Sequence, residues 1–425
     1  MADQLVVASV YLWRRLVGAI AEDTNGVVAF EYDDRFRRSR LEISPEKLPL
    51  SLAGPVSFPE LARVEAFLGL PGVFSDSLPD RFGNAVIAKY FESRGRPRDA
   101  LSPVQKLLYV GNRGMGALEY RPPILDGRNA REREPLEVAR LVEEARKIVE
   151  GAPDVAFPEM MKISSSAGGA RAKAVVLLNN DDNVVRSAFA KPQKGDEHWI
   201  LKFDGVGELG NPDPKPAPFN RIEYVYGQMA GKAGIEMPEM RLLEERDFAH
   251  LMIKRFDRDG QQKIHMHSLG GLEHADYNQP QLYSYERYFR VVNKLNLGYP
   301  ALEQAFRRAV FNILAVNQDD HVKNLSFLMD MNGDWRLSPA YDLTYARGGG
   351  FTRTHQMTFA DKDTGITIDD ILSVGRQFGI KKHGQDVIND VIEGLSQWRT
   401  LAKDAGVPIK RIDQIESEYA KPAQH

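Results

Sequence analysis

Asn317-Gln-Asp-Asp-His-Val-Lys-Asn324 and Pro339-Ala-Tyr-Asp342 are two neighbouring stretches that combine carboxylate and amide side chains. Phosphoryl transfer from Mg-ATP requires a carboxylate that accepts the proton of the substrate hydroxyl. It also requires an amide and a second carboxylate that hold the metal ion against the phosphates. Asp319 and Asn324 have the Asp-x-x-x-x-Asn spacing of the kinase catalytic loop, and Asp342 supplies the second carboxylate. The two stretches therefore predict a phosphoryl-transfer site with Asp319 as the base and Asn324 and Asp342 as ligands of Mg2+.

The pattern of apolar residues around these stretches explains how the three side chains could meet. Apolar residues recur at helical spacing over residues 302–314, which predicts a helix that ends just before the first stretch. Residues 325–337 are expected to form a hairpin around the turn Asn332-Gly333, and this hairpin would return Asp342 to the side of Asn324. Two oxygen ligands would then meet at one Mg2+. A turn-forming role is the alternative for any single Asp or Asn, but three of them at this spacing favour catalysis.

Length, charge and composition limit the possible classes of protein. The 425 residues are too many for one ordinary hydrophobic core, so we expect two or three domains. The formal net charge of -3, from 56 basic and 59 acidic residues, gives no electrostatic argument for direct binding of nucleic acid. The absence of cysteine excludes disulfides, thiolate zinc sites and a cysteine nucleophile. Neither a signal-peptide pattern nor a long apolar run is present, so we expect a cytoplasmic protein that does not enter a membrane.

Strand and helix patterns divide the chain into three expected regions. Residues 1–130 begin with a β-rich part, which includes a hairpin around Asn25-Gly26, and continue with helices, one of them expected at residues 59–68. Residues 131–257 read as a kinase N-lobe with a phosphate loop and a hinge, and residues 258–425 as a mainly helical C-lobe with the catalytic loop and metal site. The predicted fold class is α+β, with a β-rich N-terminal subdomain and a bilobal, protein-kinase-like fold.

Three upstream features could form the ATP half of the site. Residues 164–173 contain Gly168-Gly169 and Lys173 before a strand; such a loop could supply backbone donors to phosphates, although it matches neither common phosphate-loop pattern. Lys202 lies inside an apolar strand and Glu223 in the first turn of the next helix, where they could form the ion pair that positions ATP phosphates. The alternative for Lys202 is a lysine that only extends its head group from a strand to solvent.

The strand Met252-Ile-Lys-Arg-Phe-Asp257 leads into the helical region. In a bilobal kinase this position is the hinge whose backbone meets adenine. His265 and His267 share one face of the strand that follows. They could bind a metal ion, but no third ligand has a suitable spacing, so we favour a structural or substrate-side role for them.

These residues and motifs resemble the HipA family of serine/threonine kinases, the toxins of bacterial type II toxin–antitoxin pairs, over nearly the whole chain. The Asn-x-Asp-x-His-x-Lys-Asn and Tyr-Asp motifs at this separation are highly specific. The stretches that carry the resemblance are Phe74-Ser-Asp-Ser-Leu-Pro-Asp-Arg-Phe-Gly83, Ser166-Ala-Gly-Gly-Ala-Arg-Ala-Lys173, Ile200-Leu-Lys-Phe203, Ile222-Glu-Tyr224, Lys254-Arg-Phe-Asp-Arg258, Asn317 to Asn324 and Pro339 to Asp342.

The resemblance implies a catalytic base at Asp319, with Asn324 and Asp342 as metal ligands and with ATP and Mg2+ as cofactors. It also implies autophosphorylation of Ser166, with Ser164 and Ser165 as alternatives, which would eject the phosphate loop and inactivate the enzyme. The ATP contacts that it implies come from Gly168, Gly169, Ala170, Arg171, Ala172, Lys173, Lys202, Glu223, Lys254, Arg255, Phe256, His321, Lys323, Asn324, Tyr341 and Asp342.

The resemblance also implies partners. These are a HipB-like helix-turn-helix antitoxin, operator DNA bound only through that antitoxin, and a protein substrate such as an aminoacyl-tRNA synthetase. The chain departs from the family at Lys254, where glutamate is usual, at Arg171-Ala172, where Gln-Glu is common, and at His267, where an acidic residue is frequent. Two rival functions stay open: a kinase of small molecules or lipids, and a non-catalytic partner in an antitoxin–operator complex.

Overall fold

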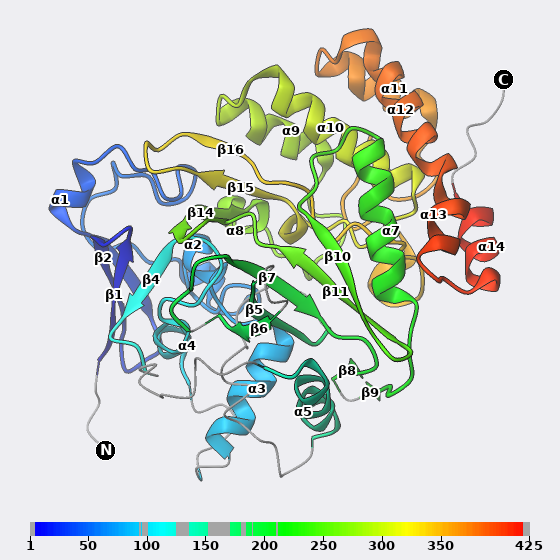
Figure 1. Cartoon of the computed structure of the whole chain (residues 1–425). Coiled ribbons are helices and arrows are strands. Elements are labelled where there is room, and N and C mark those ends of the chain that lie inside the picture. The colour runs from blue at the N-terminus through cyan, green and yellow to red at the C-terminus, as the bar shows by residue number, and fades with distance from the viewer. Residues whose placement is uncertain are drawn as a thin grey trace.

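The structure is a computed structural model, and it describes residues 5–92, 95, 101–124, 136–151, 171–179, 184–188, 190–209 and 211–419. Figure 1 shows a β-rich N-terminal part on one side, a five-stranded sheet in the middle and a mainly helical part on the other side. Strands and helices are both abundant and are partly segregated along the chain. This arrangement confirms the predicted α+β fold class.

The N-terminal part (residues 5–124) contains an antiparallel sheet in the order β3-β2-β1-β4. Its strands are β1 (Val6–Leu12), β2 (Arg15–Glu22), β3 (Val28–Tyr32) and β4 (Leu118–Arg121). Side chains alternate between the faces of a strand, so one face buries Val10, Ile20 and Phe30 against α4 (Pro103–Val110). The hairpin predicted around Asn25-Gly26 joins β2 to β3 and is confirmed.

The helix predicted at residues 59–68 is wrong. Only Pro59–Leu61 is helical, as a short 3-10 turn. Leu68 has a φ angle of 52°, which is incompatible with a right-handed helix. The chain folds back here because Phe67 and its neighbours form a small apolar cluster against Tyr277 of the helical part. Tertiary packing therefore overrides the local helical pattern.

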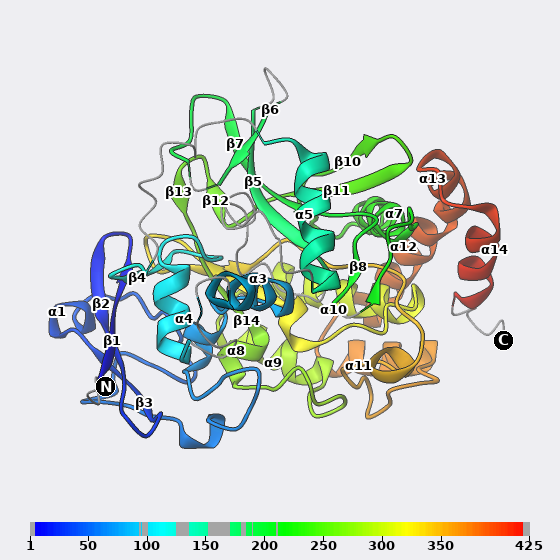
Figure 2. The same ribbon diagram turned by 90° about the horizontal axis from the view of Figure 1, so that it is seen from below.

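The central part (residues 136–257) contains an antiparallel sheet in the order β10-β11-β7-β5-β6. Its strands are β5 (Lys173–Asn179), β6 (Val184–Ser187), β7 (Asp196–Lys202), β10 (Met240–Glu245) and β11 (Phe248–Lys254). Two helices, α3 (Arg81–Glu92) and α5 (Val138–Glu150), lie side by side and share a hydrophobic core with this sheet (Figure 2). A third helix, α7 (Phe219–Lys232), packs against β10 and β11.

The helical part (residues 258–419) contains a small sheet in the order β14-β15-β16. Its strands are β14 (His265–Ser268), β15 (Ser326–Met329) and β16 (Trp335–Leu337). Its helices include α9 (Tyr285–Lys294), α10 (Gly298–Leu314), α11 (Ile368–Gln377), α12 (Gln385–Ser396), α13 (Trp398–Asp404) and α14 (Ile409–Glu418). Buried residues of α7 belong to the hydrophobic core of this part, and buried residues of α3 belong to the hydrophobic core of the central part. The division of the chain near residues 130 and 257 stays a prediction.

A buried charge cluster joins the N-terminal part to the rest of the chain. Asp257 is fully buried and accepts hydrogen bonds from the guanidinium groups of Arg255 and Arg258. Its carboxylate also accepts a hydrogen bond of 2.7 Å from the backbone amide of Gly116, which belongs to the N-terminal part. A buried charge needs this many partners, so the cluster depends on the N-terminal part being in place.

A close approach of two backbones forms a second contact. The helices α2 (Gly72–Ser75) and α8 (Leu269–Glu273) meet at Gly72 and Gly271. A Cβ atom on Gly72 would lie only 2.0 Å from the carbonyl oxygen of Gly271. Only glycine permits this approach, which seats the N-terminal part directly on the helical part.

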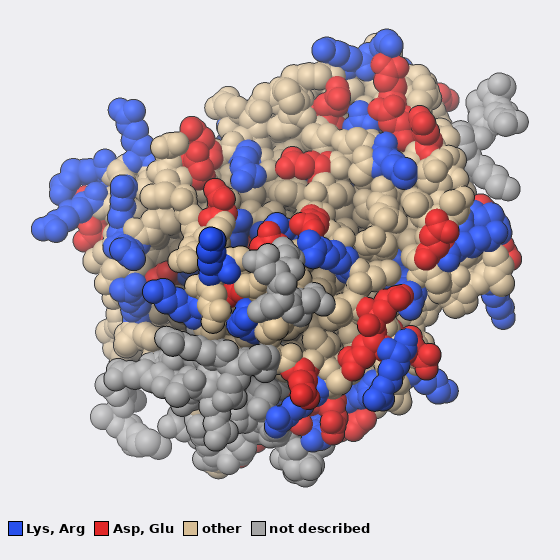
Figure 3. Space-filling model, in the orientation of Figure 1, with Lys and Arg blue, Asp and Glu red and all other residues tan. Residues whose placement is uncertain are grey.

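The surface carries charges of both signs. Figure 3 shows Lys and Arg beside Asp and Glu over most of the face in view, which agrees with the small net charge. Within the described ranges, no helix has the length and apolar character needed to cross a bilayer.

Candidate active site

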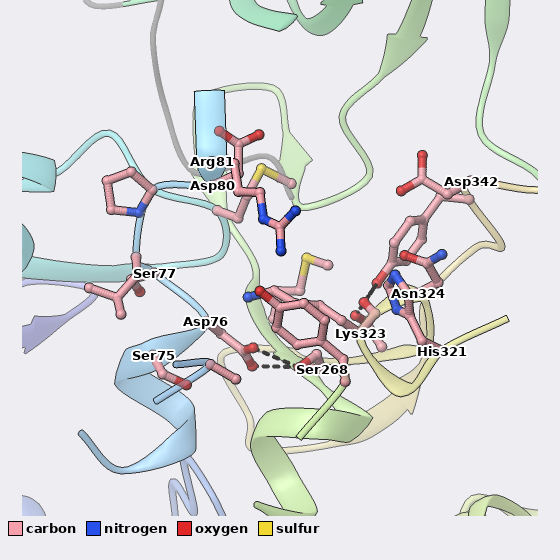
Figure 4. A pocket seen from close by; sticks show the side chains of 18 of the residues that line it. Ser75, Asp76, Ser77, Asp80, Arg81, Ser268, His321, Lys323, Asn324 and Asp342 are labelled. Atoms are coloured by element: carbon pink, nitrogen blue, oxygen red, sulfur yellow. Dashed lines mark hydrogen bonds between the residues drawn. The ribbon is translucent and has the colours of Figure 1, made fainter. Parts of the chain in front are cut away.

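A cavity of about 450 Å³ lies where the N-terminal, central and helical parts meet. Figure 4 shows two groups of side chains on opposite sides of it. We call Asp76, Asp80, Arg81 and Lys106 the N-terminal wall and Asp319, His321, Asn324 and Asp342 the catalytic wall; all eight residues line the cavity. The predicted site residues that line the cavity are Lys202, Lys254, Arg255, Phe256, Asp319, His321, Lys323, Asn324, Tyr341 and Asp342.

The catalytic loop follows the long helix α10, as the sequence predicts. The side-chain amide of Asn317 donates to Asn312 Oδ1 (2.9 Å) and so ties the start of the loop to the last turn of this helix. At the other end, Asn324 Nδ2 donates to the carbonyl oxygen of Asp319 (3.0 Å). This bond closes the loop and leaves Asn324 Oδ1 as the amide atom that can bind a cation.

Asp319 and Asp320 are adjacent in the chain but have opposite environments. The Asp319 side chain is 47% exposed and lines the cavity. The Asp320 side chain is fully buried and accepts hydrogen bonds from Tyr285 Oη (2.8 Å), His355 Nδ1 (2.9 Å) and the backbone amide of Gln356 (2.8 Å). Asp320 is therefore a structural acceptor, and Asp319 is the carboxylate that a substrate can reach.

The surroundings of Asp319 change its proton affinity. Burial raises the pKa of Asp319, and the carboxylates of Asp342 and Asp320 add to this increase. His321, whose Nε2 lies 3.9 Å from Asp319 Oδ1, opposes it but does not reverse it. A carboxylate with a raised pKa accepts a proton more readily, which suits a general base.

The ion pair predicted between Lys202 and Glu223 is present. Lys202 Nζ, at the end of β7, lies 2.6 Å from Glu223 Oε1 of α7 and also contacts Asp342 Oδ1. Burial alone would lower the pKa of Lys202, but Asp342 and Glu223 raise it overall, so this lysine stays charged. Burial alone would raise the pKa of Asp342, but the positive charges of Lys202 and Lys173 lower it overall. The lysine is therefore fixed between two carboxylates and does not simply extend to solvent.

The predicted hinge lies at the end of β11. The backbone amides of Lys254 and Arg255 donate to carbonyl groups of adjacent segments (2.8 Å each), so these two amides cannot donate to adenine. The Lys254 side chain, which departs from the family pattern, forms an ion pair with Glu197. Phe256 contacts the ring of Tyr341, with 5.6 Å between the ring centroids. The hinge therefore offers an aromatic surface, and any backbone donor to adenine must come from another residue.

Most of the predicted phosphate loop lies outside the described residues, including the predicted residues Ser166, Gly168, Gly169 and Ala170. Of the described remainder, Arg171 places its guanidinium 3.9 Å from the ring centroid of Phe219, and Ala172 is buried. Lys173 Nζ lies 3.3 Å from Asp80 Oδ2. None of these three side chains lines the cavity, and the same holds for Glu223, so their roles toward ATP stay predictions.

The N-terminal wall contains no predicted site residue. Figure 4 shows Asp76 bonded to Ser268, whose amide (2.7 Å) and hydroxyl (2.6 Å) donate to its carboxylate. His267 Nδ1 donates to the same carboxylate (2.7 Å), while its Nε2 lies 3.0 Å from Ser44 Oγ. His267 thus takes part in a structural contact between two parts of the chain. Asp76, Asp80 and Arg81 of this wall lie in residues 74–83, a stretch that contributes to the family resemblance but whose spacing predicts no chemistry.

The catalytic wall has side-chain oxygen atoms that could coordinate Mg2+. Among the described residues, no group of three or more His, Cys, Asp or Glu side chains could hold a metal ion, and His265 and His267 form no such group. Mg2+ needs fewer protein ligands, because it keeps several waters and binds phosphate oxygens. Asn324 and Asp342 both line the cavity and can provide the one or two protein oxygens that this mode requires.

Sequence comparisons identify two family models and several relatives that match parts of the chain. The family model of the HipA-like C-terminal domain matches residues 165–420, and that of the HipA N-terminal domain matches residues 8–121. A Haemophilus influenzae protein named "Putative kinase" is 26% identical over 265 residues, which cover 53% of this chain and 76% of that protein. A Sinorhizobium fredii protein named "Putative kinase Y4dM" is 27% identical over 190 residues, which cover 39% of this chain and 44% of that protein.

A solved structure has the same fold. It is the complex of Shewanella oneidensis HipA, HipB and operator DNA, which matches with a TM-score of 0.62 and 16% identity over 97% of this chain and 100% of that chain. At this identity the likeness shows the fold alone, which is the kinase-like fold that the sequence predicts. The match to the C-terminal domain covers more than half of the chain, and the N-terminal match covers most of the rest, so the chain belongs to the HipA-like family.

Proposed function

We propose that this chain is a serine/threonine protein kinase, which transfers the γ-phosphate of Mg-ATP to a hydroxyl group of a protein. One observation carries the proposal: Lys202 contacts both Glu223 and Asp342 while Asp319 lines the same cavity. A kinase needs a lysine–glutamate pair to position phosphates and a carboxylate to receive the acceptor proton. The names of two curated relatives and the family itself support the same activity.

In the proposed complex, the phosphates of ATP lie against Lys202 and the Lys173 end of the phosphate loop. The two carboxylates that hold Lys202 fix its position before ATP binds, which reduces the entropy lost on binding. The surface of Phe256 borders the adenine side. When bound, Mg2+ would be held by Asn324 and Asp342 and would neutralise charge on the β- and γ-phosphates.

Asp319 is proposed as the base of the transfer. The acceptor hydroxyl oxygen forms a bond to the γ-phosphorus, and the bond from that phosphorus to the β–γ bridging oxygen breaks. ADP leaves with the electron pair, and the hydroxyl proton passes to Asp319. The side chain is partly exposed, so Asp319 can release this proton to solvent after each turnover.

The site geometry bears on the two rival functions. A non-catalytic partner would need neither an exposed carboxylate in the catalytic loop nor a charged lysine held by two carboxylates, so the intact set favours an enzyme. A kinase of small molecules could use the same phosphate and base groups. The acceptor therefore has to be identified by experiment.

We also propose a HipB-like helix-turn-helix antitoxin as a partner, with operator DNA bound only through that antitoxin. The support is the family and the likeness to a solved complex of HipA, HipB and operator DNA. The mixed surface charge in Figure 3 gives no separate reason for direct contact with DNA. By the family resemblance, the protein target is a translation component such as an aminoacyl-tRNA synthetase, and the kinase acts in the cytoplasm.

We further propose that the kinase phosphorylates its own Ser166. Support comes from the sequence, where this serine precedes Gly168-Gly169 and Lys173. A phosphate group would add a charge of about −1.5 to −2 where the phosphates of ATP are proposed to lie. Repulsion between these groups would expel the loop and stop further transfer.

The experiment that tests the activity asks where the label from γ-labelled ATP goes. The purified protein is incubated with Mg2+ and ATP, once with a cell protein extract and once with a pool of metabolites and lipids. Label on serine or threonine of a protein, and only when Mg2+ is present, is the expected result. Label confined to small molecules would support the rival kinase, and no transfer to either pool would contradict the proposal.

A further inference from the structure

Two aromatic side chains border the cavity beside the catalytic loop, and neither has a role in the proposed ATP site. Phe351 is 54% exposed and lines the cavity. Of the large apolar side chains that are exposed in the described part of the chain, Phe351 is the only one that lines this cavity. Tyr277 lines it as well. An exposed aromatic ring at the mouth of a site is a candidate for contact with a ligand.

Hydrogen bonds connect Phe351 to the catalytic loop. The carbonyl oxygen of Phe351 accepts a hydrogen bond from the side-chain amide of Gln356. The backbone amide of Gln356 donates to Asp320 Oδ1 (2.8 Å). Asp320 directly follows Asp319, so the segment that carries Phe351 is fixed close to the proposed base.

Tyr277 packs against residues of the same loop. Its ring centroid is 5.5 Å from that of His321, and the ammonium group of Lys323 lies 5.4 Å from the Tyr277 ring centroid. The segment that follows Tyr277 is bonded to the Phe351 segment, because the amide of Gln281 donates to the carbonyl oxygen of Gln356 (2.7 Å). The two aromatic residues therefore belong to one connected border of the cavity.

This aromatic border continues into the N-terminal part. Tyr277 packs against the apolar cluster of Leu61, Ala66 and Phe67. Ala66 and Leu68 of the same turn line the cavity. The apolar border thus runs from the helical part to the N-terminal part, next to the base. Lys202 and Phe256, which are proposed to meet ATP, belong instead to the central sheet and its exit.

We propose that Phe351 and Tyr277 form a binding site for a bulky apolar side chain of the protein substrate, located within two residues of the serine or threonine that receives the phosphate. The inference rests on the proposed kinase function and adds a substrate class to it. A protein segment advances about 3.3 Å per residue, so a side chain close to the acceptor must meet the border of the cavity when the acceptor hydroxyl meets Asp319. An apolar side chain there removes the exposed surface of Phe351 from water, which favours its binding over a polar one.

The test uses the full-length protein and a positional library of peptides. Each peptide has one serine, and each of the two positions before it and after it carries either Leu or Asn in turn. The readout is the ratio of the transfer rates for the Leu and Asn peptides at each position, measured at low peptide concentration with Mg-ATP. This ratio is measured within one enzyme preparation, so a change in the folded fraction cancels out.

The wild-type protein should prefer Leu by about tenfold at one of the flanking positions, which is the scale of discrimination in an apolar site. Phe351→Ala should bring this ratio close to one, whereas Phe351→Leu should keep most of it. Leu282→Ala is the matched control, because Leu282 is 64% exposed in a neighbouring segment but does not line the cavity. This control should keep the wild-type ratio.

The possible outcomes separate the two proposals. A wild-type protein that phosphorylates the peptides without any flanking preference overturns the apolar site and leaves the kinase function intact. A preference that survives in Phe351→Ala overturns it too. Transfer to small molecules alone, or to no acceptor at all, contradicts the proposed function and this inference together.

Discussion

The two walls of the cavity differ in how the fold holds them. The residues of the catalytic wall lie within one stretch of chain, which runs from the end of α10 to the segment that follows the β15–β16 hairpin. The N-terminal wall depends on contacts between distant segments, since Asp76 and its partner His267 are 191 residues apart. Local connections therefore position the base and the metal ligands, whereas docking of the N-terminal part shapes the opposite side.

This difference separates two kinds of mutational effect. Changes in the catalytic wall should alter phosphoryl transfer while stability stays nearly constant, because its carboxylates are partly exposed. Changes at the docking contacts should lower stability first, because those groups are buried and fully bonded. The following experiments test that separation.

Lys202→Met should show the largest effect, with transfer reduced about a thousandfold, because the phosphates lose a preorganised positive charge. Lys254→Met is the matched control: it lies on the adjacent strand β11, also lines the cavity, and pairs with Glu197. This control should keep most of its activity. Initial rates at saturating ATP provide the measurement. Equal losses in both variants would contradict the proposed role of Lys202 in positioning the phosphates.

Asp257→Asn should lower the free energy of unfolding by about 3 kcal/mol, because two buried arginines lose their charged partner. Asp259→Asn, at an exposed position two residues away, should have little effect. Chemical denaturation at pH 7 measures both. A loss of transfer without a loss of stability in Asp257→Asn would contradict the expectation that contacts of the N-terminal part affect stability first.

The buried Asp257 should also make the stability of the protein depend on pH. Burial would raise the pKa of Asp257, but Arg255 and Arg258 lower it overall, below the value in the unfolded chain. Its contribution to stability is therefore fully present above about pH 4 and is lost as the pH falls toward the folded-state pKa. The difference between wild type and Asp257→Asn should accordingly shrink in acid, as denaturation curves at several pH values can show.

Asp342→Asn should weaken Mg-dependent ATP binding by at least roughly tenfold, since it removes a charged oxygen from the metal site. Calorimetry with and without Mg2+ measures this change. The same substitution removes one of the two carboxylates that hold Lys202, so that Glu223 remains as its carboxylate partner. Unchanged affinity in the presence of Mg2+ would count against Asp342 as a metal ligand.

Ser166→Ala should have the smallest immediate effect, with first turnovers at the wild-type rate and no later loss of activity. In the wild-type protein, incubation with Mg-ATP should place one phosphate on residues 164–166, and that species should be inactive. Peptide mass spectrometry and activity of the separated species provide the measurement. A phosphate at another position, or full activity of the phosphorylated form, would contradict the proposed self-inactivation.

Much of the catalytic wall is predictable because its chemistry depends on spacing within one stretch of sequence. The helical pattern before Asn317 and the turn Asn332-Gly333 correctly predict α10 and the β15–β16 hairpin. The pairing of Lys202 with Glu223 is also predicted correctly, because strand and helix follow each other closely. Regular local structure over short distances is what a single sequence encodes most clearly.

The N-terminal wall is not predictable in the same way. Asp76 has no pattern that points to His267, and the helix predicted at residues 59–68 fails because Phe67 packs against Tyr277. Both features depend on contacts between segments about 190 to 210 residues apart, which local propensity does not report.

The central claim is that Asp319 is the base of a phosphoryl-transfer site. The most direct test measures transfer rate and ATP affinity together for wild type, Asp319→Asn and the exposed control Asp334→Asn. Asp319→Asn should lose transfer by about 10²–10⁴-fold and keep its ATP affinity, because the carboxylate serves the acceptor proton rather than the nucleotide. Asp334→Asn should match the wild type in both measurements. Transfer by Asp319→Asn at close to the wild-type rate would contradict the account.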